Sequence, residues 1–234
     1  MEITANANHL PGTAVQSFIK TVLQRLFPLP CLHYRAYVNL VKNRNSYLYS
    51  TGWMRSLKER KPIDNNGLAI PWMNYAVISF LEERLSVKMN IFEFGSGYST
   101  FFYARKAKHV TSVECNAEWF NFVQSHVPEN VLLLFQKRDI DGEYCRLIGS
   151  TGYLYDIVVV DGVDRVNCVK QSISALTPEG CILIDDSHMD NHQEGIDFAK
   201  MHGFRALHYE GLKATGEGVD RTTILYRDGN CLEI

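Results

Sequence analysis

The hydrophobic positions of the chain follow two patterns, and the change falls near residue 88. Before it, apolar residues recur every three or four positions, which is typical of amphipathic helices. This spacing predicts a helix over 14–27 that stops at Pro28, and a second over 71–85 with Pro71 in its first turn. We expect the first helix to pack on the main domain, and a membrane-surface helix is the alternative.

After residue 88 the apolar residues come in short runs with helical stretches between them. Runs of Val, Ile, Leu and Phe that are apolar on both faces predict strands buried in a parallel sheet. These runs are residues 90–94, 109–114, 130–135, 155–161 and 180–185. Helical spacing predicts helices over 99–107, 117–126, 143–150, 165–176 and 191–203. Two final runs, 204–210 and 221–227, flank a glycine-rich loop and predict a hairpin.

This order of elements predicts an α/β fold. We expect a doubly wound, Rossmann-like sheet of seven strands, closed by an antiparallel hairpin, in residues 89–234. Residues 1–88 are expected to form a helical appendage. Because ligands of such sheets bind outside the carboxyl ends of the strands, the residues that end each strand are the candidates for function.

Composition narrows the class of protein. The chain has 234 residues, 46% hydrophobic and 21% charged, which is ordinary for a globular protein. The sequence shows no apolar run of membrane-spanning length and no secretory signal, so we expect a cytoplasmic protein. Six cysteines without paired spacing argue against a zinc ribbon. A net charge of −2 argues against a general nucleic-acid binder.

The charge is unevenly distributed. Residues 1–88 carry 11 Lys and Arg against 5 Asp and Glu, whereas residues 89–234 carry 13 against 21. The densest basic stretch contains Arg55, Lys58, Arg60 and Lys61. We interpret this stretch as a solvated face or a docking surface for the acidic half, and a site for an anionic substrate is the alternative.

The first predicted strand runs into a glycine-rich turn, FEFGSGYST. Gly95 and Gly97 allow a tight turn and a close approach of backbone N–H groups to a ligand. Thr100 stands where a dinucleotide fingerprint has its third glycine. Glu93 would repel a pyrophosphate but would attract a cationic amino group. The turn therefore predicts a zwitterionic, nucleotide-like cofactor rather than NAD.

Acidic residues after the second and third strands suit the rest of such a cofactor. Glu114 ends the second strand, where a carboxylate can accept both hydroxyls of a ribose. Capping of the next helix is the alternative for Glu114. Asp139 follows the third strand, where it can accept a hydrogen bond from an adenine amino group, and Asp141 is the near alternative.

These segments together resemble the class I S-adenosylmethionine-dependent methyltransferases. The matching pieces are EFGSGYST, SVE, YDIVVVDG and LTPEGCILID, and the resemblance covers roughly residues 89–227. It implies a methyl group transferred in line to a nucleophile, with the appendage shaping the acceptor pocket. The residues that it implies for holding S-adenosylmethionine are Glu93, Gly95, Ser96, Gly97 and Glu114.

Carboxylates also end the fourth and fifth strands, at Asp161 and at Asp185 with Asp186. Three carboxylates brought together at one sheet edge need protons, cations or a metal to neutralise them, and Mg²⁺ prefers such ligands. The spacing is similar to that of metal-dependent O-methyltransferases of the catechol and macrocin types. That resemblance implies Asp161, Asp185 and Asp186 as metal ligands. The alternative is that Asp161 faces only the cofactor and one Asp of the pair caps the next helix.

A general base is expected near these carboxylates. Asp161 itself and Asp164 are candidates, and His188 is a third because its ordinary pKa lies near neutrality. His192 follows four positions after His188, so a transition-metal site and a structural role are both alternatives for His188.

Weaker features flank this site. Trp72, Tyr75 and Tyr98 are aromatic residues near it, and we expect at most one of them to contact the acceptor. Lys213 and the glycines of residues 211–218 predict a lid over the strand ends.

The sequence therefore predicts an S-adenosylmethionine-dependent methyltransferase that acts on an oxygen of a small molecule or sugar. Mg²⁺ is a second expected cofactor, and neither nucleic acid nor a membrane span is expected. An NAD-linked oxidoreductase on the same broad fold is one alternative. A non-catalytic cofactor-binding module is the other, since fold does not fix function.

Overall fold

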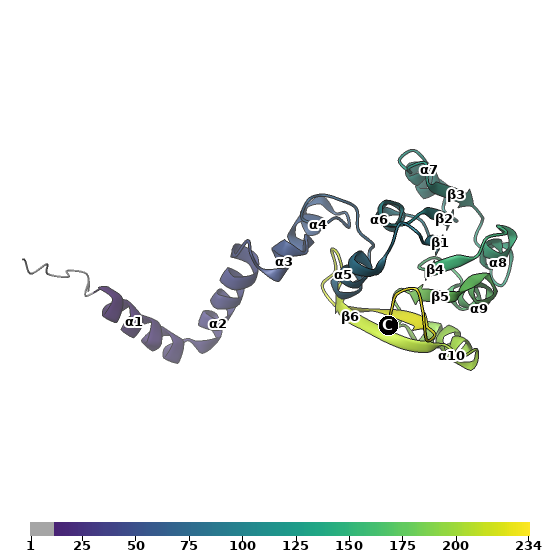
Figure 1. Ribbon diagram of the computed structural model, residues 1–234. Coiled ribbons are helices and arrows are strands. Elements are labelled where there is room, and N and C mark those ends of the chain that lie inside the picture. Colours follow the sequence, from purple (N-terminus) through teal and green to yellow (C-terminus); the bar gives the residue numbers. More distant parts are fainter. Residues whose placement is uncertain (1–11) are drawn as a thin grey trace, which may run out of the picture. The chain divides into compact units, whose positions relative to one another are not determined.

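The computed structural model describes residues 12–234, which belong to two compact units (Figure 1). The division falls between Ser50 and Thr51, not at the predicted residue 88. Residues 51–88 group with the sheet because hydrogen bonds tie them to it. Within this unit, Trp53 Nε1 donates to the carbonyl of Gly216 over 2.9 Å, and Asn74 pairs with Lys213 as an isolated antiparallel bridge.

The described part of the N-terminal unit is helical. Its elements are α1 (Gly12–Leu26), α2 (Pro28–Tyr37), a π-helical turn η1 (Val38–Lys42) and α3 (Tyr47–Ser50). The predicted helix over 14–27 is confirmed as α1. Pro28 does more than end it, because Pro28 is also the first residue of α2, a position where the missing N–H has no intrahelical partner to lose.

The C-terminal unit is built on one seven-stranded sheet with the order β3-β2-β1-β4-β5-β7-β6. The strands are β1 (Asn90–Phe94), β2 (His109–Glu114), β3 (Val131–Phe135), β4 (Tyr155–Val160), β5 (Leu176–Ile184), β6 (Arg205–Leu212) and β7 (Val219–Tyr226). The first five strands pair in parallel, and β7 runs antiparallel between β5 and β6. The predicted doubly wound sheet with its closing hairpin is confirmed.

Helices connect the strands. They are α4 (Trp53–Glu59), α5 (Tyr75–Arg84), α6 (Tyr98–Lys106), α7 (Ala117–Gln124), α8 (Glu143–Ser150), α9 (Arg165–Ser172) and α10 (Gln193–Met201), with 3₁₀ turns η2 (Ile173–Ala175) and η3 (Asp190–His192). The helix predicted over 71–85 begins later than expected. Asn74 is its N-cap, with its side chain accepting from the Val77 N–H over 3.1 Å, so Pro71 lies outside the helix.

Two apolar layers cover the two faces of the sheet. On one face, Ile91 of β1 and Val159 of β4 pack with α5 and α6. On the other, Phe92 of β1 and Val158 of β4 pack with α8, α9 and α10. Successive strand residues thus bury on opposite faces, which explains why the sequence shows continuous apolar runs and no alternation.

The topology brings several strand ends to one edge. β1 and β4 are neighbours in the sheet, although two strands separate them along the chain, so the strand order reverses between them. Ligands bind at such a reversal because the connections on its two sides leave toward opposite faces. In the part of the chain that the structure describes, no helix is both long and apolar enough to cross a membrane.

Candidate active site

A crevice of about 750 Å³ lies at the carboxyl ends of β1, β2 and β4. This is the edge at which the strand order reverses, and the volume is in the range of small-molecule sites. The predicted site residues that line it are Gly95, Ser96, Gly97, Glu114 and Asp161. The structure therefore brings together residues that lie up to 66 positions apart in the sequence.

The turn after β1 is held in one conformation. Gly95 has a φ of +92°, and a Cβ at this position would lie 2.9 Å from the backbone of Gly162. A side chain is therefore excluded there both by backbone strain and by the close approach of the β4 end. The Gly97 N–H donates to Thr100 Oγ1 over 2.9 Å, and the carbonyl of Ser96 accepts from the indole N–H of Trp119.

Glu93 lies beneath this turn and does not line the crevice. It is fully buried, and its Oε2 accepts from the hydroxyls of Thr100 and Ser112, the latter over 2.7 Å. Its Oε1 is buried without a hydrogen-bond partner among the described residues. Burial raises the pKa of Glu93 to about 7, against the hydrogen bonds that lower it.

Glu114 lines the crevice and supports the turn from the next strand. Its Oε2 accepts from the backbone N–H and the hydroxyl of Ser96, both over 3.1 Å. Its Oε1 accepts from the N–H groups of Cys115 and Asn116, both over 2.8 Å. The carboxylate is thus held at the crevice wall by four donors.

An aromatic wall borders the same crevice, and two of its members, Trp119 and Phe122, were not predicted from the sequence. Trp119 and Phe122 of α7 stack with ring centroids 4.9 Å apart, and the ring of Tyr98 lies 6.4 Å from each. The aromatic residues at the start of the helix after Glu114 were the sequence pattern that could have predicted this wall. Among the other aromatic candidates, Trp72 lines the crevice and Tyr75 is buried in the core.

Two predicted residues lie outside the crevice and have structural partners. Asp139 caps α8, accepting from the N–H groups of Glu143 over 2.7 Å and Tyr144 over 3.1 Å. Asp164 accepts from the Asp141 N–H and from the Asn167 side chain, each over 2.8 Å. Both carboxylates therefore hold loops and helix ends, and neither reaches the crevice lining.

A cluster of four carboxylates lies at the ends of β4 and β5. Ligand oxygens of Asp161, Asp185 and Asp186 lie within 4.8 Å of one another, as the sequence predicted. Asp220 of β7 joins them, because the hairpin inserts beside β5. We call these four residues the carboxylate cluster. Only Asp161 also lines the crevice, so it links the two features.

Two cations of the chain neutralise the carboxylate cluster. Lys213 Nζ lies 3.1 Å from Asp185 Oδ2 and 2.8 Å from Asp186 Oδ1. Arg165 Nη2 lies 3.1 Å from Asp161 Oδ1 and 3.5 Å from Asp186 Oδ2. Lys213 is therefore fixed within the cluster, and the loop that carries it is tied down where a lid was predicted.

Burial and mutual repulsion also shift the pKa values of these carboxylates. Burial, reinforced by the nearby carboxylate charges, raises the pKa of Asp161 and raises that of Asp220 to about 7. Burial also raises the pKa of Asp185. For Asp186, burial acts in the same direction but Lys213 outweighs it, so the pKa of Asp186 falls below its ordinary value. Lys213 stays protonated because the surrounding carboxylates raise its pKa against the effect of burial.

The histidines lie at the outer side of this cluster. His188 is half-exposed, with Nδ1 3.6 Å from Asp220 Oδ1. Ligand atoms of Asp186, His188 and Asp220 lie within 4.8 Å of one another, but Lys213 Nζ is also 3.9 Å from Asp220 Oδ1. His192 is buried, with Nδ1 3.1 Å from the Asp186 carbonyl, and burial lowers its pKa.

No protein-family model and no curated protein matches the sequence, but solved structures match the fold. An rRNA methylase from Streptococcus thermophilus has a TM-score of 0.50 at 14% identity, covering 65% of this chain and 95% of its own. A precorrin-6y C5,15-methyltransferase from Geobacter metallireducens has a TM-score of 0.49 at 14% identity, and the match covers 71% of this chain and 97% of that one. An O-methyltransferase from Bacillus cereus has a TM-score of 0.48 at 17% identity, and the match covers 59% of this chain and 74% of that one.

The chain has the class I methyltransferase fold. The expected resemblance is therefore confirmed at the level of the fold. The crevice of this chain lies at the carboxyl ends of β1, β2 and β4, the edge where ligands of doubly wound sheets bind. Since one of the matching structures is an rRNA methylase, the fold itself does not select the acceptor.

One rim of the crevice is cationic. Arg60 and Lys61 line it together with Trp72, whereas Arg55 of the same basic stretch pairs with Glu59, with Nε 2.8 Å from Oε1. Arg60 and Lys61 are thus exposed residues at the rim of the crevice, whereas Arg55 is held in an ion pair. In the class I methyltransferase fold of this chain, residues before β1 thus complete the wall of the site.

Proposed function

We propose that the protein is a cytoplasmic S-adenosylmethionine-dependent methyltransferase that acts on a hydroxyl oxygen of a small molecule or sugar. One observation carries this proposal: Glu114, the Gly95–Gly97 turn and Asp161 all line one crevice at the strand reversal. These are the contacts that a ribose, an amino-acid tail and a reacting group would need.

The donor fits the residues that are present. Glu114 has its carboxylate at the crevice wall, where ribose hydroxyls can replace the Ser96 hydroxyl on Oε2. The rings of Trp119 and Phe122 provide a flat apolar surface for an adenine. Arg60 and Lys61 provide cations for a carboxylate, which the donor's amino-acid tail or the acceptor can supply.

The bound donor would supply an electrophilic methyl group on a positively charged sulfur. The chain's own residues then have to orient the acceptor and receive its proton. We propose Asp161 for this role, because it is the member of the carboxylate cluster that lines the crevice. Arg165 holds Asp161 in place through its Nη2, 3.1 Å from both Oδ1 and the Asp161 carbonyl oxygen.

Resident Mg²⁺ does not fit the carboxylate cluster as it stands. Its donor oxygens are hard, as Mg²⁺ prefers, but the Lys213 ammonium lies against both Asp185 and Asp186. A divalent ion there would have to displace an ammonium that the same carboxylates bind. We propose that Lys213 and Arg165 neutralise the carboxylates as a metal would.

Calorimetric titration of the full chain with S-adenosylhomocysteine and with NAD⁺ tests this function. We expect binding of S-adenosylhomocysteine and none of NAD⁺. Glu114→Gln should weaken S-adenosylhomocysteine binding about 10-fold, because a charged acceptor of two hydroxyls is lost. Asp164→Asn is the matched control and should bind normally. Absence of S-adenosylhomocysteine binding by the unaltered chain would overturn the proposal.

A further inference from the structure

The first helix of the N-terminal unit presents an apolar stripe. Large apolar residues of α1 recur at three- and four-residue steps, and Phe18 is 70% exposed and Leu26 66%. By helical spacing, the polar residues Ser17 and Thr21 lie off this stripe, on the side of the helix away from Leu26. A side chain as large as Phe18 exposed within such a stripe indicates a surface made for an apolar environment.

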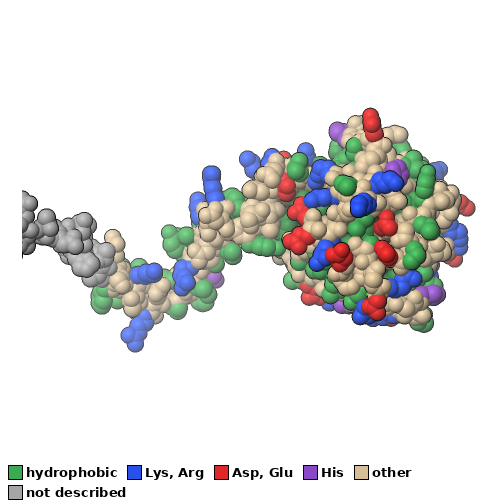
Figure 2. All heavy atoms as spheres, in the orientation of Figure 1, with side chains coloured by type: hydrophobic (Ala, Val, Ile, Leu, Met, Phe, Trp, Pro, Cys, Tyr) green, Lys and Arg blue, Asp and Glu red, His purple; other side chains and the backbone are tan. Residues whose placement is uncertain are grey.

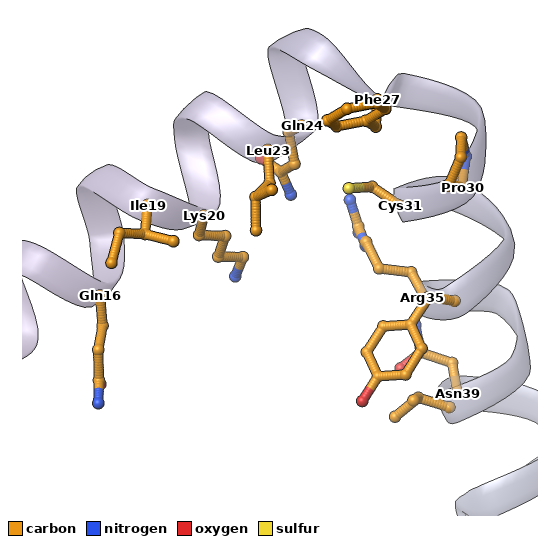
Figure 3. A pocket seen from close by; sticks show the side chains of 12 residues that line it. Gln16, Ile19, Lys20, Leu23, Gln24, Phe27, Pro30, Cys31, Arg35 and Asn39 are labelled. Atoms are coloured by element: carbon orange, nitrogen blue, oxygen red, sulfur yellow. The ribbon is translucent and has the colours of Figure 1, made fainter.

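The second helix continues this apolar surface. Leu29 is 65% exposed and Leu32 57% in α2, and Tyr37 follows at its end. Between α1 and α2 lies an open groove of about 690 Å³, shown in Figure 3, whose walls include Leu23 and Phe27. The unit therefore exposes apolar side chains on its stripe and in its groove, with no tight core of its own among the described residues.

The charge of this unit has one sign. Between Glu2 and Glu59 the sequence contains no Asp or Glu. Within residues 3–50 the Lys and Arg residues are Lys20, Arg25, Arg35, Lys42 and Arg44. Figure 2 shows blue and green side chains along these helices on the visible face, and no red ones.

From these two features we infer that the N-terminal unit binds the surface of an anionic lipid bilayer. Amphipathic helices with Lys and Arg on the polar side lie in the bilayer interface, with their apolar side among the acyl chains. Each basic side chain near an anionic surface adds attraction, and residues 3–50 contain five Lys and Arg with no Asp or Glu to oppose them.

Other occupants fit this surface less well. A second copy would bring five more cations against the first five, which repel each other. RNA would pair with the cations but would leave Leu26, Leu29 and Leu32 uncovered, because aliphatic side chains offer its phosphates and bases little. An anionic bilayer can both attract the basic side chains and bury the exposed apolar side chains of this unit.

The test is sedimentation of the full chain with vesicles, compared between two variants of equal charge. The vesicles are an equimolar mixture of phosphatidylglycerol and phosphatidylcholine, or phosphatidylcholine alone. One variant combines Phe18→Glu with Leu26→Glu on the apolar stripe. The matched control combines Ser17→Glu with Thr21→Glu on the polar side, and circular dichroism verifies that both stay helical.

We expect the unaltered chain to sediment with the mixed vesicles and not with phosphatidylcholine alone, and added salt to weaken this binding. The stripe variant should lose about a hundredfold in partition coefficient, because two large side chains leave the acyl region. The control should lose far less. Failure to bind mixed vesicles, or an equal loss in both variants, would overturn the inference.

Two further outcomes would give the surface to another occupant and also overturn the inference. One is a chain that is dimeric by light scattering and becomes monomeric in the stripe variant alone. The other is a stripe variant with a lowered melting temperature of the C-terminal unit, which would indicate packing within the chain. None of these results depends on whether the crevice binds S-adenosylhomocysteine, so the inference and the proposed function fail separately.

Discussion

At the scale of single residues, burial decides what the acidic side chains do. Glu93 and Glu114 end neighbouring strands, yet one lies under the turn and the other faces the crevice. Asp161, at the crevice, lies beside the buried Asp185, and two neighbouring carboxylates cannot both stay charged without partners. The pKa values of these acidic side chains depend on Lys213 and on the low polarity around them. Two predictions follow from these pKa values and contacts.

The first prediction concerns pH and Glu93. Its ordinary pKa of 4.5 rises to about 7 in the folded chain, so the folded state favours the protonated form. This group therefore stabilises the fold fully below its ordinary pKa, and the contribution is lost as pH rises through about 7. Urea unfolding should show a fall of about 1–3 kcal/mol from this group between about pH 5 and about pH 8.

Glu93→Gln should reduce that fall, because an amide keeps the hydrogen-bond acceptor and has no proton to lose. A smaller fall should remain, since the pKa of Asp220 also lies at about 7. Glu179→Gln, at an exposed site in β5, is the control and should keep the slope of the unaltered chain. Identical slopes in the unaltered chain and Glu93→Gln would show that Glu93 is charged in the fold.

The second prediction concerns Lys213 and Mg²⁺. Since Lys213 already lies between Asp185 and Asp186, we expect titration calorimetry to detect no Mg²⁺ binding by the unaltered chain. Lys213→Met should bind Mg²⁺, because the carboxylates lose their cation. The same variant without Mg²⁺ should be destabilised by about 3–5 kcal/mol.

Lys200→Met is the control for this change, because Lys200 forms an exposed ion pair with Asp197 and lies outside the carboxylate cluster. It should neither bind Mg²⁺ nor lose more than about 1 kcal/mol of stability. Binding of Mg²⁺ by the unaltered chain would contradict the prediction and would restore Asp161, Asp185 and Asp186 as metal ligands.

At the scale of elements, one N-cap connects a helix to the carboxylate cluster. Asn74 begins α5, and its Nδ2 donates to the Tyr209 carbonyl over 3.1 Å and to Thr222 Oγ1 over 3.2 Å. Thr222 Oγ1 in turn donates to Asp185 Oδ1 over 2.7 Å. The hairpin β6–β7 is thereby fixed to the helix before β1, which positions both Asp220 and Lys213.

Asn74→Ala should therefore lower the free energy of unfolding by more than the loss of an ordinary N-cap does. We expect about 2–4 kcal/mol of unfolding free energy, because a cap and two buried hydrogen bonds are lost together. Asn116 is the N-cap of α7, and its side chain accepts from the Trp119 N–H at an exposed site. Asn116→Ala should therefore lower the free energy of unfolding by about 1 kcal/mol. Chemical denaturation of both variants measures the difference, and equal losses would contradict the link to the hairpin.

At the scale of the whole molecule, the core and the crevice both belong to the C-terminal unit. Among the described residues, the buried hydrophobic side chains all lie between Ile63 and Leu232. The crevice lining begins at Arg60. The unit that starts at Thr51 thus contains what a folded cofactor-binding domain requires.

A chain that begins at Thr51 should therefore fold and bind S-adenosylhomocysteine with the affinity of the full chain. Its melting temperature, measured by differential scanning calorimetry, should also be unchanged. A chain that begins at residue 89, the predicted boundary, should fail to fold because it lacks α5 and its buried residues Val77 and Leu81. A stable, binding-competent chain from residue 89 would show that residues 51–88 are dispensable.

The sequence by itself determined the order of strands and helices, because apolar runs and helical spacing record burial on one or two faces. It also located Gly95, Gly97, Glu114 and Asp161, because parallel strands that end at one edge bring their last residues together. It could not show that Glu93 lies under the turn, or that Asp139 and Asp164 cap and brace loops. Those outcomes depend on which backbone N–H groups happen to lie within reach.

Only the tertiary structure decided how the carboxylate cluster is neutralised. Asp220 comes from the closing hairpin, 59 positions after Asp161, and no local pattern marks it as a neighbour of Asp161. Lys213 was expected over the strand ends as part of a lid, but only the fold shows that it binds Asp185 and Asp186. Trp119 likewise reaches the crevice only through the packing of α7. Sequence patterns report which faces of an element are buried, but the contacts between distant elements are set by how the whole sheet packs.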